Sequence, residues 1–209
     1  MSDLPLIDHI GFHTCSLEGG YESIKKDAPF LSGNGEDQWL TQGYYFWTDS
    51  PYYASSWTPK GVKRGSDKKA IGKFSIKLAA GYNSQDLLDL VGNVKDQEDF
   101  LKLANRFITR LGHEKLSQVT VREVIGELRR INKLGRTEGM FPYKGVKAVD
   151  NRKHKYEMRF VLPKYHGLKL PLITPQQMCI FEEARDCIEI VGFEHPKEFK
   201  DNFDKTFKE

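Results

Sequence analysis

Two helical patterns follow one another in the sequence between residues 96 and 135. Short strand patterns precede and follow them. From Phe100 to Leu111 apolar residues recur at three- and four-residue spacing, which gives a helix one apolar face, and Gly112 is suited to end that helix. Thr120-Val121-Arg122-Glu123 is a capping-box pattern, and an apolar stripe from Val121 to Ile131 follows it. This organisation predicts a mixed α+β fold in which the helical block is an insertion.

The strand patterns are short runs of alternating or aromatic residues. We expect strands at 5–15, 43–48, 70–78, 87–90, 145–149, 156–162, 177–181 and 187–193. Asp49-Ser50-Pro51 is typical of a helix start, so a short helix should follow from Tyr52 to Trp57. Residues 17–38 are rich in Gly and contain Pro29, which predicts a loop with at most one helical turn. Residues from 196 onward predict a short surface helix or a frayed tail with Phe at spacings of four.

Bulk properties narrow the class of protein. A chain of 209 residues with 39% hydrophobic and 29% charged residues is typical of one soluble globular domain. No apolar stretch approaches the roughly 18–20 residues of a membrane span, and no secretory pattern opens the chain. The three cysteines predict reduced thiols and a cytoplasmic protein. A net charge of +3 does not by itself indicate a nucleic-acid binder, although it leaves room for local patches.

Several common site motifs are absent from the sequence. There is no Gly-rich phosphate loop ending in Lys-Ser or Lys-Thr, no dinucleotide-binding G-x-G-x-x-G and no G-x-S-x-G nucleophile elbow. His9, His13 and Cys15 are spaced for zinc only if a fourth ligand comes from elsewhere, so we expect no metal.

Three residues at strand edges are candidates for chemistry. His13 ends the first strand pattern, Tyr45 lies in the aromatic run after Gln42-Gly43, and Gln177 opens the run to Phe181. Taken singly, each has a structural explanation, because a lone histidine is often hydrogen-bonded within a fold and strands favour aromatic residues for packing. Their order along the chain is more informative than any one of them.

The order His, Tyr, Gln resembles the His-Tyr-Glu signature of NAD-dependent ADP-ribosyltransferases of the diphtheria-toxin and poly(ADP-ribose) polymerase-like clade. The resemblance covers residues 8–90 and, more loosely, 156–193, and the block at 96–135 resembles an insertion. It implies split antiparallel β-sheets around an NAD cleft, with residues 1–209 forming a single ADP-ribosyltransferase-like domain.

The resemblance also implies roles for individual residues. His13 would bond a ribose hydroxyl of NAD, and the backbone of Thr14, where the family usually has Gly, would clamp the nicotinamide amide. Tyr45 would stack on nicotinamide, and lysines near Lys25-Lys26 would flank the diphosphate. The implied catalytic residues are His13, Tyr45 and Gln177, and the implied NAD-binding residues are His13, Thr14, Tyr45, Ser55 and Trp57.

Gln177 departs from the family pattern, which has Glu at this place. Gln keeps a hydrogen bond but removes the negative charge that would stabilise an oxocarbenium-like transition state. The resemblance therefore implies a mono-ADP-ribosyltransferase that releases nicotinamide and modifies a macromolecular target. Two alternatives stay open: a catalytically weak or inactive NAD-binding or interaction module, and a related NAD-consuming enzyme such as an NAD glycohydrolase or RNA 2′-phosphotransferase.

Basic residues gather at 60–69, 122–136 and 152–155. A basic helix face is most often simply solvated. Where a protein or nucleic-acid target docks, the basic helical insertion is the natural surface for it. The sequence names neither the target nor the biological role, which leaves toxin, defence factor and regulator as alternatives.

Overall fold

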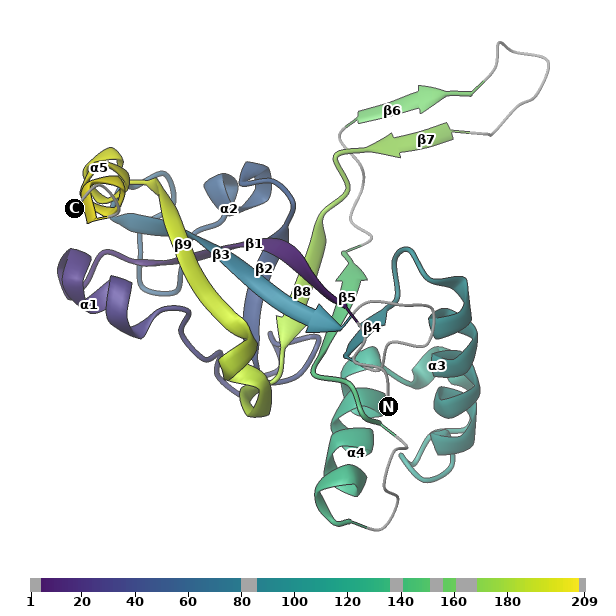
Figure 1. The fold of residues 1–209 in the computed structure, drawn as a ribbon. Coiled ribbons are helices and arrows are strands. Elements are labelled where there is room, and N and C mark those ends of the chain that lie inside the picture. Colours follow the sequence, from purple (N-terminus) through teal and green to yellow (C-terminus); the bar gives the residue numbers. More distant parts are fainter. Residues whose placement is uncertain (1–4, 80–85, 136–140, 151–155, 161–168, 207–209) are drawn as a thin grey trace.

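The computed structural model describes residues 5–79, 86–135, 141–150, 156–160 and 169–206. Seven strands form one sheet in the order β4-β5-β8-β2-β1-β3-β9, and β6 and β7 form a separate hairpin (Figure 1). The strands are β1 (Leu6–Ser16), β2 (Tyr44–Thr48), β3 (Lys69–Ala79), β4 (Leu87–Asp89), β5 (Gly145–Val149), β6 (Tyr156–Arg159), β7 (Lys169–Leu172), β8 (Gln176–Ile180) and β9 (Ile188–His195).

The helices are fewer and lie against this sheet. The α-helices are α1 (Gly20–Asp27), α2 (Tyr52–Ser56), α3 (Val94–Phe107), α4 (Val121–Lys133) and α5 (Lys197–Thr206), with 3-10 turns η1 (Leu116–Gln118) and η2 (Glu182–Cys187). The mixed α+β class predicted from the sequence is confirmed. The described residues contain no helix with the length and apolar composition that crossing a membrane requires.

The large sheet is mixed rather than wholly antiparallel. All neighbouring strands in it run antiparallel except β4 and β5, which are parallel. The expected purely antiparallel arrangement is wrong for this pair. The reason is the helical insertion, because α3 and α4 together form the long crossover that returns the chain in the same direction.

The two faces of the sheet carry separate apolar clusters. Phe46, Phe74 and Ile180 point to one face, where α1 contributes Ile24 and α5 contributes Phe203. On the opposite face, α3 and α4 cover β4, β5 and β8, whereas α2 covers part of β1, β2 and β3. Different helices therefore cover the two ends of the second face.

Two local predictions differ from the structure, and a third is confirmed. Residues 20–27 form α1 instead of a loop, because Gly19, which has a φ of 88°, and Pro29 flank this helix and do not interrupt it. The strand β7 was missed because Pro171 lies within it, a residue that edge strands tolerate. Helix α5 confirms the predicted short surface helix: most of its residues are exposed, while Phe199 and Phe203 are buried against the sheet; Phe207 lies outside the described residues.

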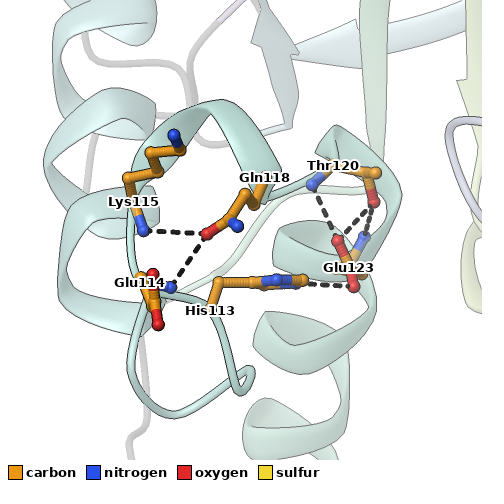
Figure 2. Close-up of polar contacts among 6 residues, drawn as sticks. All are labelled: His113, Glu114, Lys115, Gln118, Thr120 and Glu123. Carbon is orange, nitrogen blue, oxygen red and sulfur yellow. Dashed lines mark hydrogen bonds and ion pairs between the residues drawn. The ribbon is translucent and has the colours of Figure 1, made fainter.

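The turn before α4 is held by the capping box that the sequence predicts. Thr120 Oγ1 accepts a hydrogen bond from the Glu123 N–H at 3.1 Å, and Glu123 Oε2 accepts one from the Thr120 N–H at 2.7 Å. Figure 2 shows His113 reaching the same carboxylate, with 3.0 Å between His113 Nε2 and Glu123 Oε1. The Thr120 backbone N–H, followed by His113, holds the pKa of Glu123 below its usual value.

Candidate functional site

A gap opens within the sheet where β1 and β2 separate. These strands pair only at Gly11–Thr48 and Phe12–Trp47, and beyond Phe12 the residues of β1 pair with β3 alone. A pocket of about 460 Å³ lies over this gap, a size typical of small-molecule sites. Its walls come from β1, β2, β8, the loop at residues 30–39 and the segment that follows α2.

Most of the candidate residues meet at this pocket. His13 and Thr14 reach it from β1, Tyr45 from β2, Gln177 from β8 and Trp57 from the end of α2. The three strands are neighbours in the sheet, in the order β8-β2-β1, although the residues come from distant parts of the chain.

Ser55 and the two lysines of α1 lie elsewhere. Ser55 is exposed and is not part of the pocket wall. Lys25 and Lys26 do not line the pocket either, since Lys25 Nζ lies 5.6 Å from the ring centres of both Tyr21 and Phe203. A diphosphate held in this pocket would therefore find its nearest lysine at Lys60, which is part of the wall.

His13 bridges the two separating strands. Its Nδ1 lies 2.9 Å from the carbonyl oxygen of Tyr45, and the Phe30 N–H points at its Nε2 from 3.4 Å. Burial lowers the pKa of His13, so the ring is neutral near pH 7. A neutral ring with its proton on Nδ1 donates to Tyr45 and leaves the Nε2 lone pair as an acceptor, held only by the long contact to Phe30.

The Thr14 hydroxyl does not enter the pocket as a free group. It donates to the Ala54 carbonyl at 3.1 Å and so ties α2 to β1. This contact also fixes the position of Trp57 just beyond α2, where the ring centre lies 6.0 Å from that of Trp47. Thr14 thus has a structural use in this chain.

Tyr45 is held by the loop before it. Its hydroxyl donates to the Thr41 carbonyl at 2.7 Å and accepts from the Leu40 N–H at 3.0 Å. Burial, followed by the neighbouring Cys179, raises the pKa of Tyr45, so the hydroxyl stays protonated. Thr41 has a φ of 72°, a strained value for a β-branched residue. Arg129 of α4 supports it, because Nη1 donates to Thr41 Oγ1 at 2.9 Å and to the Gln42 carbonyl at 2.7 Å.

Gln177 is oriented by Trp39. The Trp39 indole N–H donates to Gln177 Oε1 at 3.0 Å, and Gln177 is only 9% exposed. Because an indole N–H can only donate, it fixes which end of the amide is the oxygen. The remaining group, the Nε2 amide, donates to no acceptor in the described part of the chain, so it is available to a ligand in the pocket.

The sequence did not predict that the loop at residues 30–39 lines the pocket, or that charged side chains do so. Trp39 stands in a Gly-rich loop and carried no periodic signal, and its role depends on a partner far along the chain. Asp37, Lys60 and Asp150 add two carboxylates and one ammonium to the wall. They make the pocket suited to a ligand with hydroxyls and mixed charge.

The cysteines are unsuited to act as nucleophiles. Cys15 lines the pocket, but burial raises its pKa to about 11, and burial raises the pKa of Cys179 to about 12. All three cysteines are free thiols, as the sequence predicts. The described residues hold no group of three or more His, Cys, Asp or Glu side chains that is placed to bind a metal ion.

Comparison with protein-family models, curated proteins and solved structures found no match to this chain. The pocket and its residues are therefore the basis for assigning a function.

Proposed function

We propose that this protein is an NAD-dependent mono-ADP-ribosyltransferase with an ADP-ribosyltransferase-like fold, and that NAD binds as substrate in the pocket between β1 and β2. The observation that supports this most directly is the meeting of His13, Tyr45 and Gln177 at one pocket on three adjacent strands. The sequence signature requires such a meeting, and nothing in the residue spacing alone guarantees it.

Each side chain has a role that its contacts allow. The Tyr45 ring, fixed through its hydroxyl, offers an aromatic face to the cationic nicotinamide, an interaction of about 0.5–2 kcal/mol. The Nε2 lone pair of neutral His13, which accepts only the long 3.4 Å contact from the Phe30 N–H, would accept a hydrogen bond from a ribose hydroxyl in its place. Gln177 donates from its amide nitrogen to a ligand oxygen.

The proposed reaction needs no strong base from the protein. The bond between the anomeric carbon and nicotinamide breaks, and neutral nicotinamide leaves with the electron pair. A nucleophile on the target then bonds to the anomeric carbon, and its proton passes to water. Departure of the leaving group dominates the barrier, so positioning of NAD is the main task of these side chains.

One observation favours a second candidate, a module that binds NAD with little or no turnover. The Gln177 oxygen is occupied by Trp39, so the pocket receives a hydrogen-bond donor at the place where the family presents a carboxylate. A donor binds a ribose oxygen but does not stabilise positive charge at the anomeric carbon.

The test follows free nicotinamide and labelled ADP-ribose after the protein is mixed with NAD and a cell extract. Tyr45→Ala should abolish nicotinamide release, whereas Tyr45→Phe should retain part of it, because the ring remains but its hydroxyl contacts with Thr41 and Leu40 are lost. Circular dichroism of both variants checks that the fold is intact.

Three outcomes separate the candidates. Label on a macromolecule supports the transferase, and free ADP-ribose with nicotinamide indicates a glycohydrolase. Thermal protection by NAD without nicotinamide release identifies the binding module. Equal release by wild type and Tyr45→Ala would contradict the assignment of this pocket.

A further inference from the structure

Residues 57–69 form a loop at the rim of the pocket, and the two ends of this loop lie close together. Trp57, Pro59 and Lys60 are part of the pocket wall. At the other end of the loop, Lys69 Nζ donates to the Trp57 carbonyl at 3.0 Å and also to the Ser55 carbonyl, which brings the two ends together. We call these residues the rim loop.

The rim loop carries cations that have no ion-pair partner among the residues that the structure describes. Lys60, Lys63, Arg64 and Lys68 are exposed, and none of them forms a salt bridge within the described part of the chain. Asp67 is the only acidic residue of the loop. The loop therefore presents net positive charge beside the pocket, and this charge is available to a polyanion.

The basic face of α4 is different, although the sequence made it the natural docking surface. Arg129 and Lys133 both pair with Glu183, and Arg130 pairs with Glu127. Arg122 donates to the Asn34 carbonyl at 3.1 Å. These four cations hold the chain to itself, so the rim loop offers more unneutralised charge for a partner.

One exposed aromatic ring belongs to the rim loop itself, and another lies on the helix that precedes it. Trp57 is 45% exposed, and Tyr52, on the preceding helix, is 40% exposed. Aromatic rings that stack bases, next to cations that follow a phosphate backbone, are typical of sequence-tolerant binding to single-stranded nucleic acid. An acidic protein surface would use the cations but would give the exposed Trp57 ring no stacking partner.

We propose that the rim loop binds single-stranded nucleic acid and presents it to the pocket as the acceptor. The acceptor role rests on the proposed transferase function, whereas the binding does not. In the transfer, the bond from the anomeric carbon to nicotinamide breaks, a nitrogen or oxygen of the nucleic acid bonds to that carbon, and its proton passes to water. Single-stranded nucleic acid suits this role because its unpaired bases can turn toward the protein.

The first experiment measures binding without NAD. Fluorescently labelled RNA and DNA strands of mixed sequence and about 20 nucleotides, longer than the roughly 4–16 nucleotides that one small domain covers, are titrated at several salt concentrations. The test variant is Lys63→Gln/Arg64→Gln, because neither residue lines the pocket. The matched control is Arg106→Gln/Lys115→Gln, which removes two exposed cations from the helical insertion that likewise form no ion pair in the described residues.

We expect the test variant to reduce the slope of log affinity against log salt by about 1.4, since each lost phosphate contact on a single strand removes about 0.7. The control should leave this slope unchanged. Trp57→Ala should weaken binding by roughly tenfold or more through the loss of stacking. Both loop variants should fold normally by circular dichroism.

The outcomes separate this inference from the proposed function. Loss of strand binding in the loop variants but not in the control supports the inference, even where no nicotinamide is released. No binding of either strand by the wild type, or equal loss in test and control variants, overturns it. Nicotinamide release by a protein that binds no nucleic-acid strand would also overturn this inference. It would leave the transferase proposal intact, and an acidic protein would be the next acceptor to test.

Discussion

At the scale of single residues, Gln177 determines which hydrogen-bonding group this wall of the pocket offers to a ligand. Its oxygen accepts from Trp39, and its nitrogen is available to a ligand. A glutamate at the same position would keep the Trp39 contact as a stronger, charge-assisted bond. Its second oxygen would carry negative charge into the pocket.

We therefore predict that Gln177→Glu increases the rate of nicotinamide release, by about tenfold or more, because electrostatic stabilisation of the transition state is regained. The measurement is single-turnover release of nicotinamide at saturating NAD. Gln176→Glu is the matched control, since the side chain of Gln176 bonds Thr174 and does not line the pocket. A rate unchanged by Gln177→Glu would count against cleavage of NAD at this site.

His13 should make stability depend on pH. Burial holds its pKa below the ordinary value in the folded chain, so below about pH 6.5 the unfolded chain binds more protons than the folded one. Stability is therefore fully present above about pH 6.5 and is lost as the pH falls toward the folded pKa. Burial, followed by Lys147, lowers the pKa of His9 too, so His9 acts in the same direction.

We predict that His13→Asn flattens the decline in unfolding free energy between about pH 7 and 5, because Asn retains a donor but does not titrate there. Urea denaturation across this range measures the effect. The same measurement on His9→Asn gives the comparison. The pH dependence of the unfolding free energy that remains in this variant isolates the contribution of His13. A His13→Asn slope equal to that of the wild type would show that the histidine is not buried in its neutral form.

At the scale of elements, the sequence predicts those whose signals are local. The strand Gly145–Val149 agrees to the residue, and α4 begins at the predicted capping box because Thr120 and Glu123 satisfy each other's backbone groups. The helix α1 is short and polar and buries only Ile24, so its apolar pattern is too weak to recognise. Its existence depends on contacts with the core.

The same reasoning explains which site residues could be found. His13, Tyr45 and Gln177 were found through their order along the chain. Trp39 and Arg129 were not, because each acts on a residue distant in sequence, Gln177 in one case and Thr41 in the other. No local pattern encodes such a contact.

Arg129 makes the insertion part of the pocket's support. Its guanidinium lies 4.3 Å from the ring centre of Phe181, and its donors reach Thr41, Gln42 and Glu183. Since Thr41 in turn holds the Tyr45 hydroxyl, α4 stabilises the strained turn that leads into β2.

We predict that Arg129→Ala lowers the free energy of unfolding by about 2–3 kcal/mol, because it leaves buried acceptors without donors. For a chain of this size the melting temperature should fall by about 2–4 °C for each kcal/mol. Differential scanning calorimetry measures the change. Arg130→Ala, on the same helix but exposed, should cost no more than about 1 kcal/mol. Equal effects of the two variants would refute the supporting role of Arg129.

At the scale of the whole molecule, the pocket lies between the two neighbouring strands of the sheet that share the fewest paired residues. The strands β4, β5, β8 and β2 stand on one side of the gap, and β1, β3 and β9 on the other. Two backbone residue pairs, the His13–Tyr45 hydrogen bond and the ring contact of His13 with Phe46 join β1 to β2. A ligand in this gap touches both sides at once, so its binding should stabilise the sheet as a unit.

We predict that NAD raises the melting temperature by about 5–11 °C at a concentration of 100 times its dissociation constant, where binding adds about 2.7 kcal/mol. Hydrogen exchange should slow at residues 13–16 and 44–46 together, because the ligand closes the gap from both strands. Tyr45→Ala should lose most of this shift, and nicotinamide or ADP-ribose alone should give less of it. Absence of any shift at millimolar NAD would refute the proposed substrate, while strand binding by the rim loop would stand as a separate result.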